Sequence, residues 1–170
     1  MKKTSDGTAF TFHWSYIGLP VAVLLLSVIL AVFFYPRLPD EIAYRFLTDG
    51  LPYKWGGRGS VVFWMLLLQV LLSLVAGAIT WGVNLLAARY IEPEGTVIKP
   101  QRIILLMGNM ITLIQIILGF AMLDIFSYNL FQVHLLPLWL FALIVLIVGG
   151  IIMGIFFLRT VWQSWIASKE

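Results

Sequence analysis

Four long apolar runs dominate this chain and cover approximately residues 16–35, 61–88, 103–127 and 135–158. A helix needs about 20 apolar residues to cross the hydrocarbon core of a bilayer, and each run reaches that length. Hydrophobic residues make up 61% of the sequence and charged residues only 11%, too few polar side chains to cover a soluble domain of this size. The sequence therefore predicts an all-α integral membrane protein, with four transmembrane helices in a single membrane domain over residues 1–170.

The first apolar run is expected to be kept as a helix rather than cleaved as a signal peptide. Lys2 and Lys3 precede it, as in a signal peptide, but the apolar stretch from Ile17 to Phe34 is longer than a typical signal core. It continues into Tyr35 and Pro36 without a small-residue cleavage site.

The distribution of Lys and Arg predicts the orientation. Four spans place both termini and the second connection on one side, where seven basic residues gather: Lys2, Lys3, Arg89, Lys99, Arg102, Arg159 and Lys169. The other side carries four: Arg37, Arg45, Lys54 and Arg58. Because cytoplasmic segments are enriched in Lys and Arg, we expect cytoplasmic N- and C-termini and a multi-pass protein of the cell membrane. Retained cytoplasmic cations explain the net charge of +3 without a nucleic-acid partner.

Residues 36–60, between the first two runs, form a polar segment that is expected to fold as a small extracytoplasmic hairpin-like loop. It holds seven of the nineteen charged side chains, with four Gly and three Pro. Ile42, Tyr44 and Phe46 alternate with other residues as in a strand, and residues 48–52 supply turn chemistry. Within that turn, Gly50 is suited to a positive φ angle. A short helix beginning at Pro39 is the competing interpretation.

The same loop carries the candidate binding residues. Charged and aromatic side chains there can meet an anionic or amphipathic ligand, and the candidates are Arg45, Tyr53, Lys54, Trp55 and Arg58. We also expect Trp55 to pack beneath Ile42, Tyr44 or Phe46 and so to hold the loop closed.

Polar residues within the spans are few. Asn84, Asn109, Thr112 and Gln115 form a possible polar seam, and the last three share one broad helix face. The seam can line a pathway or make hydrogen bonds between helices, and the second interpretation is favoured because none of the four is ionisable. Asp124, near the outer end of the third run, is expected to reach the interface or to pair with an outer-loop Arg.

Small residues predict helix packing. Two pairs at four-residue spacing permit close approach of helices: Ser73 with Gly77, and Gly150 with Gly154. His13 and His134 fall at opposite membrane faces and cannot together bind a haem, and no ligand spacing predicts a metal site or a cofactor. No nucleotide-binding or hydrolase motif is present, so the sequence does not predict an enzyme.

The loop also resembles a known family. The pattern Leu-Pro-acidic-x-Ile, an aromatic residue, Gly-x-Pro, and Trp-Gly before a basic residue is similar to a bacterial domain of unknown function that opens SdpI-type toxin-immunity proteins of the inner membrane. The matching residues are Leu38, Pro39, Asp40, Glu41, Ile42, Phe46, Gly50, Pro52, Trp55, Gly56 and Arg58. Two positions differ from that pattern, because Arg45 replaces its His and Ala43 its second Pro.

Three functions remain open from the sequence. The first is a binding, sensing or immunity-like membrane protein, whose outer loop recognises a peptide, toxin or lipid. The second is an accessory subunit of a larger membrane complex or a homo-oligomer. The third, weaker because the spans lack a central ionisable residue, is a small transporter or channel.

Overall fold

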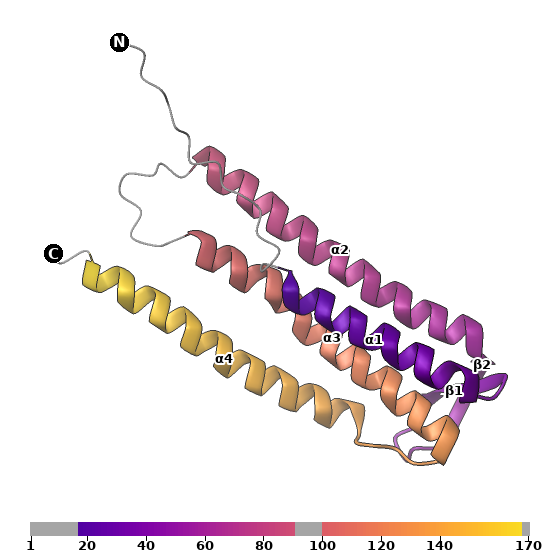
Figure 1. Cartoon of the computed structure of the whole chain (residues 1–170). Helices are drawn as coiled ribbons and strands as arrows, with labels where there is room; N and C mark the ends of the chain where they lie inside the picture. The colour runs from indigo at the N-terminus through magenta and orange to yellow at the C-terminus, as the bar shows by residue number, and fades with distance from the viewer. Residues whose placement is uncertain (1–16, 91–99, 168–170) are drawn as a thin grey trace, which may run out of the picture.

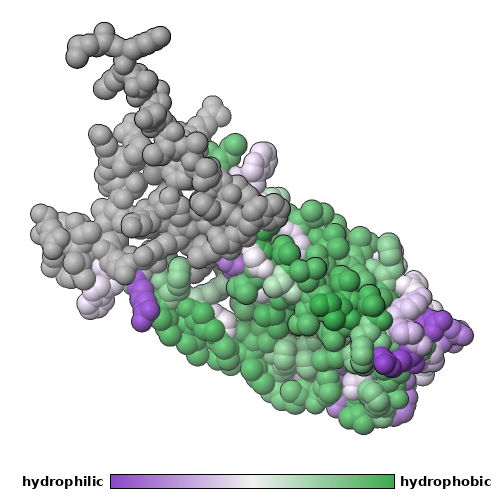
Figure 2. Space-filling model, viewed as in Figure 1, coloured by the Kyte–Doolittle hydropathy of each residue, from purple (hydrophilic) through white to green (hydrophobic). Residues whose placement is uncertain are grey.

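The computed structural model describes residues 17–90 and 100–167, which form four helices and a two-stranded hairpin (Figure 1). The elements in chain order are α1 Gly18–Phe34, the 3₁₀ turn η2 Tyr35–Arg37, β1 Glu41–Phe46, β2 Pro52–Gly57, α2 Arg58–Tyr90, α3 Pro100–Phe131 and α4 Leu138–Ala167. All four helices in these ranges are long and apolar enough to cross a membrane. This architecture fits the predicted multi-pass membrane protein, and the described residues on the face shown in Figure 2 are mostly apolar along the helices.

Two helix boundaries differ from the predicted ones for local reasons. α3 continues to Phe131 and ends where Gln132 adopts a φ of 56°, with its N–H donating to the carbonyl of Tyr128 at 2.8 Å. This left-handed cap is a common helix stop. α4 begins at Leu138 rather than 135, directly after Pro137, whose carbonyl accepts the N–H of Leu140 and of Phe141. A proline at the start of a helix leaves no hydrogen bond unmade.

α3 is the central helix, because it packs against α1, α2, α4 and strand β1. α4 stands to one side and packs mainly against α3 (Figure 1). Phe120 of α3 and Phe141 of α4 stack face to face with their ring centroids 3.8 Å apart.

Gly149 allows the close approach of α4 to α3, whereas the predicted pair Gly150 and Gly154 does not take part in it. A Cβ atom added to Gly149 would overlap the side chain of Leu113. The same addition at Gly150 or Gly154 would meet nothing within 4 Å, and the same is true of Gly77. Gly149, next to the predicted pair, therefore makes the close contact with α3. Gly150 and Gly154 lie on an exposed face of α4.

Gly149→Leu should separate α4 from α3. A larger side chain forced into a packed contact typically costs about 1–3 kcal/mol, whereas Gly150→Leu adds the same side chain where the space is open. Because the chain has no cysteine, disulfide formation between Phe120→Cys and Phe141→Cys reports the contact in either background. We expect the cross-link yield to fall only with Gly149→Leu, and equal yields in both backgrounds would contradict this packing.

Candidate functional site

The segment after η2 is an antiparallel hairpin, formed by β1 and β2, rather than a helix beginning at Pro39. Ile42 lies opposite Gly56 and Ala43 opposite Trp55, and the register shifts on either side of Arg45. Gly50 adopts a φ of 84° in the turn, as its position predicts. The hairpin lies at the end of the bundle where α1 ends and α2 begins (Figure 1).

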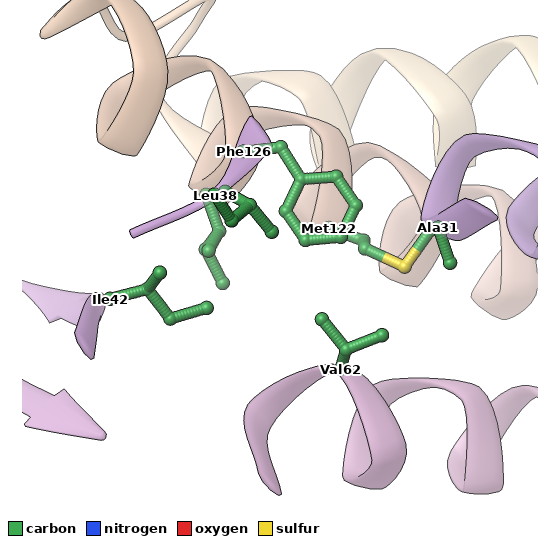
Figure 3. Packing of buried hydrophobic residues seen from close by; sticks show 7 residues of the cluster. Ala31, Leu38, Ile42, Val62, Met122 and Phe126 are labelled. Atoms are coloured by element: carbon green, nitrogen blue, oxygen red, sulfur yellow. The ribbon is translucent and has the colours of Figure 1, made fainter. Parts of the chain in front are cut away.

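Ile42 anchors the inner face of the hairpin. Its side chain is 0% exposed and belongs to a cluster contributed by all the neighbouring elements: Ala31 of α1, Leu38 after η2, Val62 of α2, and Met122, Ile125 and Phe126 of α3 (Figure 3). Gly56 lies opposite Ile42, and a Cβ there would come within 3.3 Å of both Tyr44 and Val61. A larger residue at that position would therefore require the side chains of Tyr44 and Val61 to shift slightly.

Asn129, near the end of α3, extends the hydrogen bonding of β1. Its Oδ1 accepts the N–H of Ala43 at 2.8 Å, and its Nδ2 donates to the carbonyl of Ala43 at 2.9 Å. Nδ2 also donates to the carbonyl of Ile125. One side-chain amide thus satisfies both backbone groups of a fully buried residue, as an adjacent strand would. Asn129 was not among the predicted site residues, since the third apolar run was expected to end at residue 127 and a lone amide beyond it carries no periodic signal.

Arg58 fixes the base of the hairpin. Its Nη1 donates to the carbonyl of Leu38 at 2.9 Å, its Nη2 is 3.2 Å from Oδ1 of Asp40, and its guanidinium lies over the ring of Tyr35. The Asp40 side chain is 93% exposed, so the ion pair itself contributes little. The hydrogen bond to the carbonyl of Leu38, a buried residue, matters more than the ion pair. It indicates a structural role for Arg58, which was predicted to be a binding residue.

His134, after α3, holds the turn of the hairpin. Its Nδ1 is 2.9 Å from Oδ2 of Asp124 and its Nε2 is 3.1 Å from the carbonyl oxygen of Gly50. The imidazole ring stacks on Tyr128 and meets Phe46 edge-on. Asp124 therefore pairs with this histidine and with the N–H of Leu135. The expected partner, an outer-loop Arg, is not the one found.

Four of the five predicted binding residues are exposed on the hairpin, and this exposed set is called its outer face: Arg45, Tyr53, Lys54 and Trp55. Arg45 and Lys54 are cross-strand partners. The prediction that Trp55 packs beneath the strand residues is wrong, because its side chain is 53% exposed. The difference arises from the strand that Trp55 occupies. α3 packs against β1, so Ala43 is buried while its cross-strand partner Trp55 on β2 is exposed.

A second polar centre lies between α2 and α3. Nε2 of Gln69 donates to the carbonyl of Gln115 at 3.0 Å, and Nε2 of Gln115 donates to the carbonyl of Gln69 at 3.2 Å and to Oγ of Ser73 at 2.9 Å. Both glutamines are buried. For Gln115 the structure therefore agrees with the favoured interpretation of hydrogen bonding between helices, and Gln69 is the partner that the sequence analysis missed.

The other predicted seam residues are Thr112, Asn109 and Asn84. Thr112 is buried on the same face of α3, and Asn109 also has an interaction partner. The side chain of Asn84 and all of His13 lie outside the described residues. Among the residues that the structure describes, no three His, Asp or Glu side chains gather as a metal site would require.

Comparison with known proteins gives one match. Residues 22–70 match a family described as "Domain of unknown function (DUF1648)". The matched segment covers most of α1, the hairpin and the first part of α2, which is under a third of the chain. The predicted resemblance to a domain of unknown function is thus confirmed for this segment, while the link to SdpI-type proteins stays a prediction. No curated protein and no solved structure matches the chain.

Proposed function

We propose that this chain is a non-enzymatic membrane protein that binds or senses a ligand through the outer face of the hairpin. The proposal rests on one observation: some hairpin residues fix it to the helices, and others are exposed. Ile42, Ala43 and Arg58 fix it to the helices. Arg45, Tyr53, Lys54 and Trp55 lie exposed on this supported frame. A rigid frame that presents charged and aromatic groups is typical of recognition surfaces.

The proposed setting is the inner membrane of a bacterial cell, with the hairpin outside and both termini in the cytoplasm. The excess of Lys and Arg on the side of the termini, seven against four, supports this orientation. Single cysteines at Ser60 and at Ser168 test it in intact cells. A membrane-impermeant maleimide should label Ser60→Cys only, and labelling of Ser168→Cys would reverse the assignment.

The resemblance of residues 38–58 to the opening domain of SdpI-type proteins adds an immunity-like role to this proposal. In that role the ligand is a peptide or toxin that acts at the outer face of the membrane. The spans themselves are proposed to serve as the scaffold that holds the hairpin at this face.

Photo-cross-linking in cells tests the recognition surface directly. A photoreactive amino acid at Tyr53 should yield a discrete adduct, either with a protein or with one class of lipid. The same probe at Phe157, an exposed residue of α4, should react with the membrane lipids in proportion to their abundance. Arg45→Ala with Lys54→Ala should reduce the Tyr53 adduct while leaving protein abundance unchanged, because exposed cations contribute little to stability. Identical products from the two probes would rule out a recognition surface on the hairpin.

A second candidate, an accessory subunit of a larger complex or a homo-oligomer, is favoured by the exposed face of α4. Gly150 and Gly154 on that face have open space above them, and such pairs permit close approach of a helix from another chain. If Gly150→Leu shifts the protein to a smaller species on a native gel, while the Tyr53 probe finds nothing, the subunit role replaces the first proposal.

The third candidate, a small transporter or channel, is supported only by the polar centre between α2 and α3. The Oε1 atoms of Gln69 and Gln115 are buried and accept no hydrogen bond from the described residues, so they are potential ligands for a cation. The amide groups of both side chains nevertheless bond across the α2–α3 contact. That use in helix packing supports the scaffold interpretation over a pathway.

A further inference from the structure

The outer face of the hairpin contains a pair of like charges at a single cross-strand position. Arg45 and Lys54 lie opposite each other, which places their Cα atoms about 5 Å apart. Like charges opposite each other in a sheet are destabilising. Within residues 17–90 and 100–167 the ion pairs are Arg58 with Asp40 and His134 with Asp124, so no described residue forms an ion pair with Arg45 or Lys54. An anion between the two cations would remove this repulsion.

The same hairpin exposes aromatic and apolar side chains near the two cations in the sequence. Tyr53 and Trp55 follow one another along β2 on either side of Lys54, with 46% and 53% of their surface exposed. At the turn of the hairpin, Leu47 and Leu51 are exposed by 51% and 60%. A loop surrounded by water gains nothing by exposing two leucines, whereas a loop in contact with lipid buries them.

The hairpin also adjoins the ends of two candidate membrane spans. The first span ends at Arg37 and the second begins at Arg58, so the two strands lie within a few residues of the apolar segments on both sides. Figure 2 shows polar side chains at this end of the molecule directly beside the apolar surface of the helices. Tyrosine and tryptophan concentrate at the level of the lipid headgroups because their rings have an apolar body and a polar edge.

We propose that the outer face of the hairpin binds the headgroup of an anionic phospholipid. Arg45 and Lys54 contact the phosphate, Tyr53 and Trp55 lie beside the headgroup, and Leu47 and Leu51 reach the acyl chains. The inference rests on the proposed function, since it names the ligand class for the same recognition surface. The exposed leucines favour a lipid over an acidic peptide, which would satisfy the two cations and leave both leucines in water.

Native mass spectrometry of the full chain with mixed lipids tests this assignment. The protein is released from vesicles of phosphatidylcholine with phosphatidylglycerol, and the bound lipids are counted. We expect the wild-type chain to retain phosphatidylglycerol preferentially. Arg45→Gln with Lys54→Gln should reduce the preference about 30-fold, since a cation near an anionic surface contributes roughly 1 kcal/mol. Arg37→Gln with Arg159→Gln removes the same net charge elsewhere and should keep most of the preference.

Three outcomes would overturn the assignment. The first is an unchanged preference in the Arg45 and Lys54 double variant, and the second is an equal loss in the two double variants. The third is displacement of the bound lipid from the wild-type chain by soluble polyglutamate, which would identify an acidic peptide as the occupant. A protein adduct from the Tyr53 probe without any lipid preference would remove this inference and leave the proposed function standing.

Discussion

Ile42→Ala should release the hairpin from the helices. Truncating a fully buried isoleucine typically costs about 2–5 kcal/mol, and Ile42 is the hairpin residue that lies fully buried in the cluster shared by α1, α2 and α3. Because a two-stranded hairpin is at best marginally stable by itself, the loss falls on the hairpin before it affects the spans. Hydrogen exchange of residues 41–57 in nanodiscs should rise strongly, with little change in the middle of α2 or α3.

Trp55→Ala is the matched control. It removes a larger side chain from the paired strand, but one that is half exposed and lies outside the cluster. Exchange in the hairpin should therefore stay close to that of the wild type. If the two variants raise exchange in the hairpin equally, Ile42 is not its anchor. Trp55 would then hold the loop closed, as expected from the sequence.

Asn129→Leu should detach β1 from α3. Two backbone groups of the buried Ala43 lose their partner in this variant, and an unsatisfied buried polar group costs about 1–3 kcal/mol. We expect rapid amide exchange at Ala43 and a lower midpoint of thermal unfolding in detergent.

Asn129→Asp separates the two hydrogen bonds made with Ala43. The carboxylate retains an acceptor for the N–H of Ala43 but has no donor for its carbonyl, so exchange at Ala43 should lie between that of the wild type and that of the leucine variant. Wild-type exchange in Asn129→Leu would mean that the backbone of Ala43 does not depend on α3.

The membrane spans and the course of the hairpin follow from local sequence signals. An apolar run of more than about 20 residues has few alternatives to a transmembrane helix. The alternation from Ile42 to Phe46 and the glycine at position 50 indicate strands and a turn at short range, and the structure has both there. The end of α3 and the start of α4 differ from the predicted bounds by a few residues, because the left-handed Gln132 and Pro137 decide them locally.

The contacts between elements could not be predicted in the same way. Asn129 meets Ala43 across 86 positions of the sequence, and Gln69 meets Gln115 across 46. Their partners depend on how α3 is rotated and how far it is shifted along its neighbours, and no periodicity encodes either quantity. The expectation for Trp55 failed for a related reason, because α3 packs against β1 and the sequence does not indicate which of the two strands a helix covers.

The contact between Asn129 and Ala43 also has a consequence for the order of assembly during synthesis. The segment similar to the domain of unknown function ends at residue 70, yet Met122, Phe126 and Asn129 of α3 complete its hairpin. While the ribosome has delivered only α1 and α2, the two strands lack these contacts from α3. The hairpin therefore reaches its final form only after α3 has entered the membrane beside it. A chain ending at residue 90 should insert both of its spans and leave the hairpin open to protease.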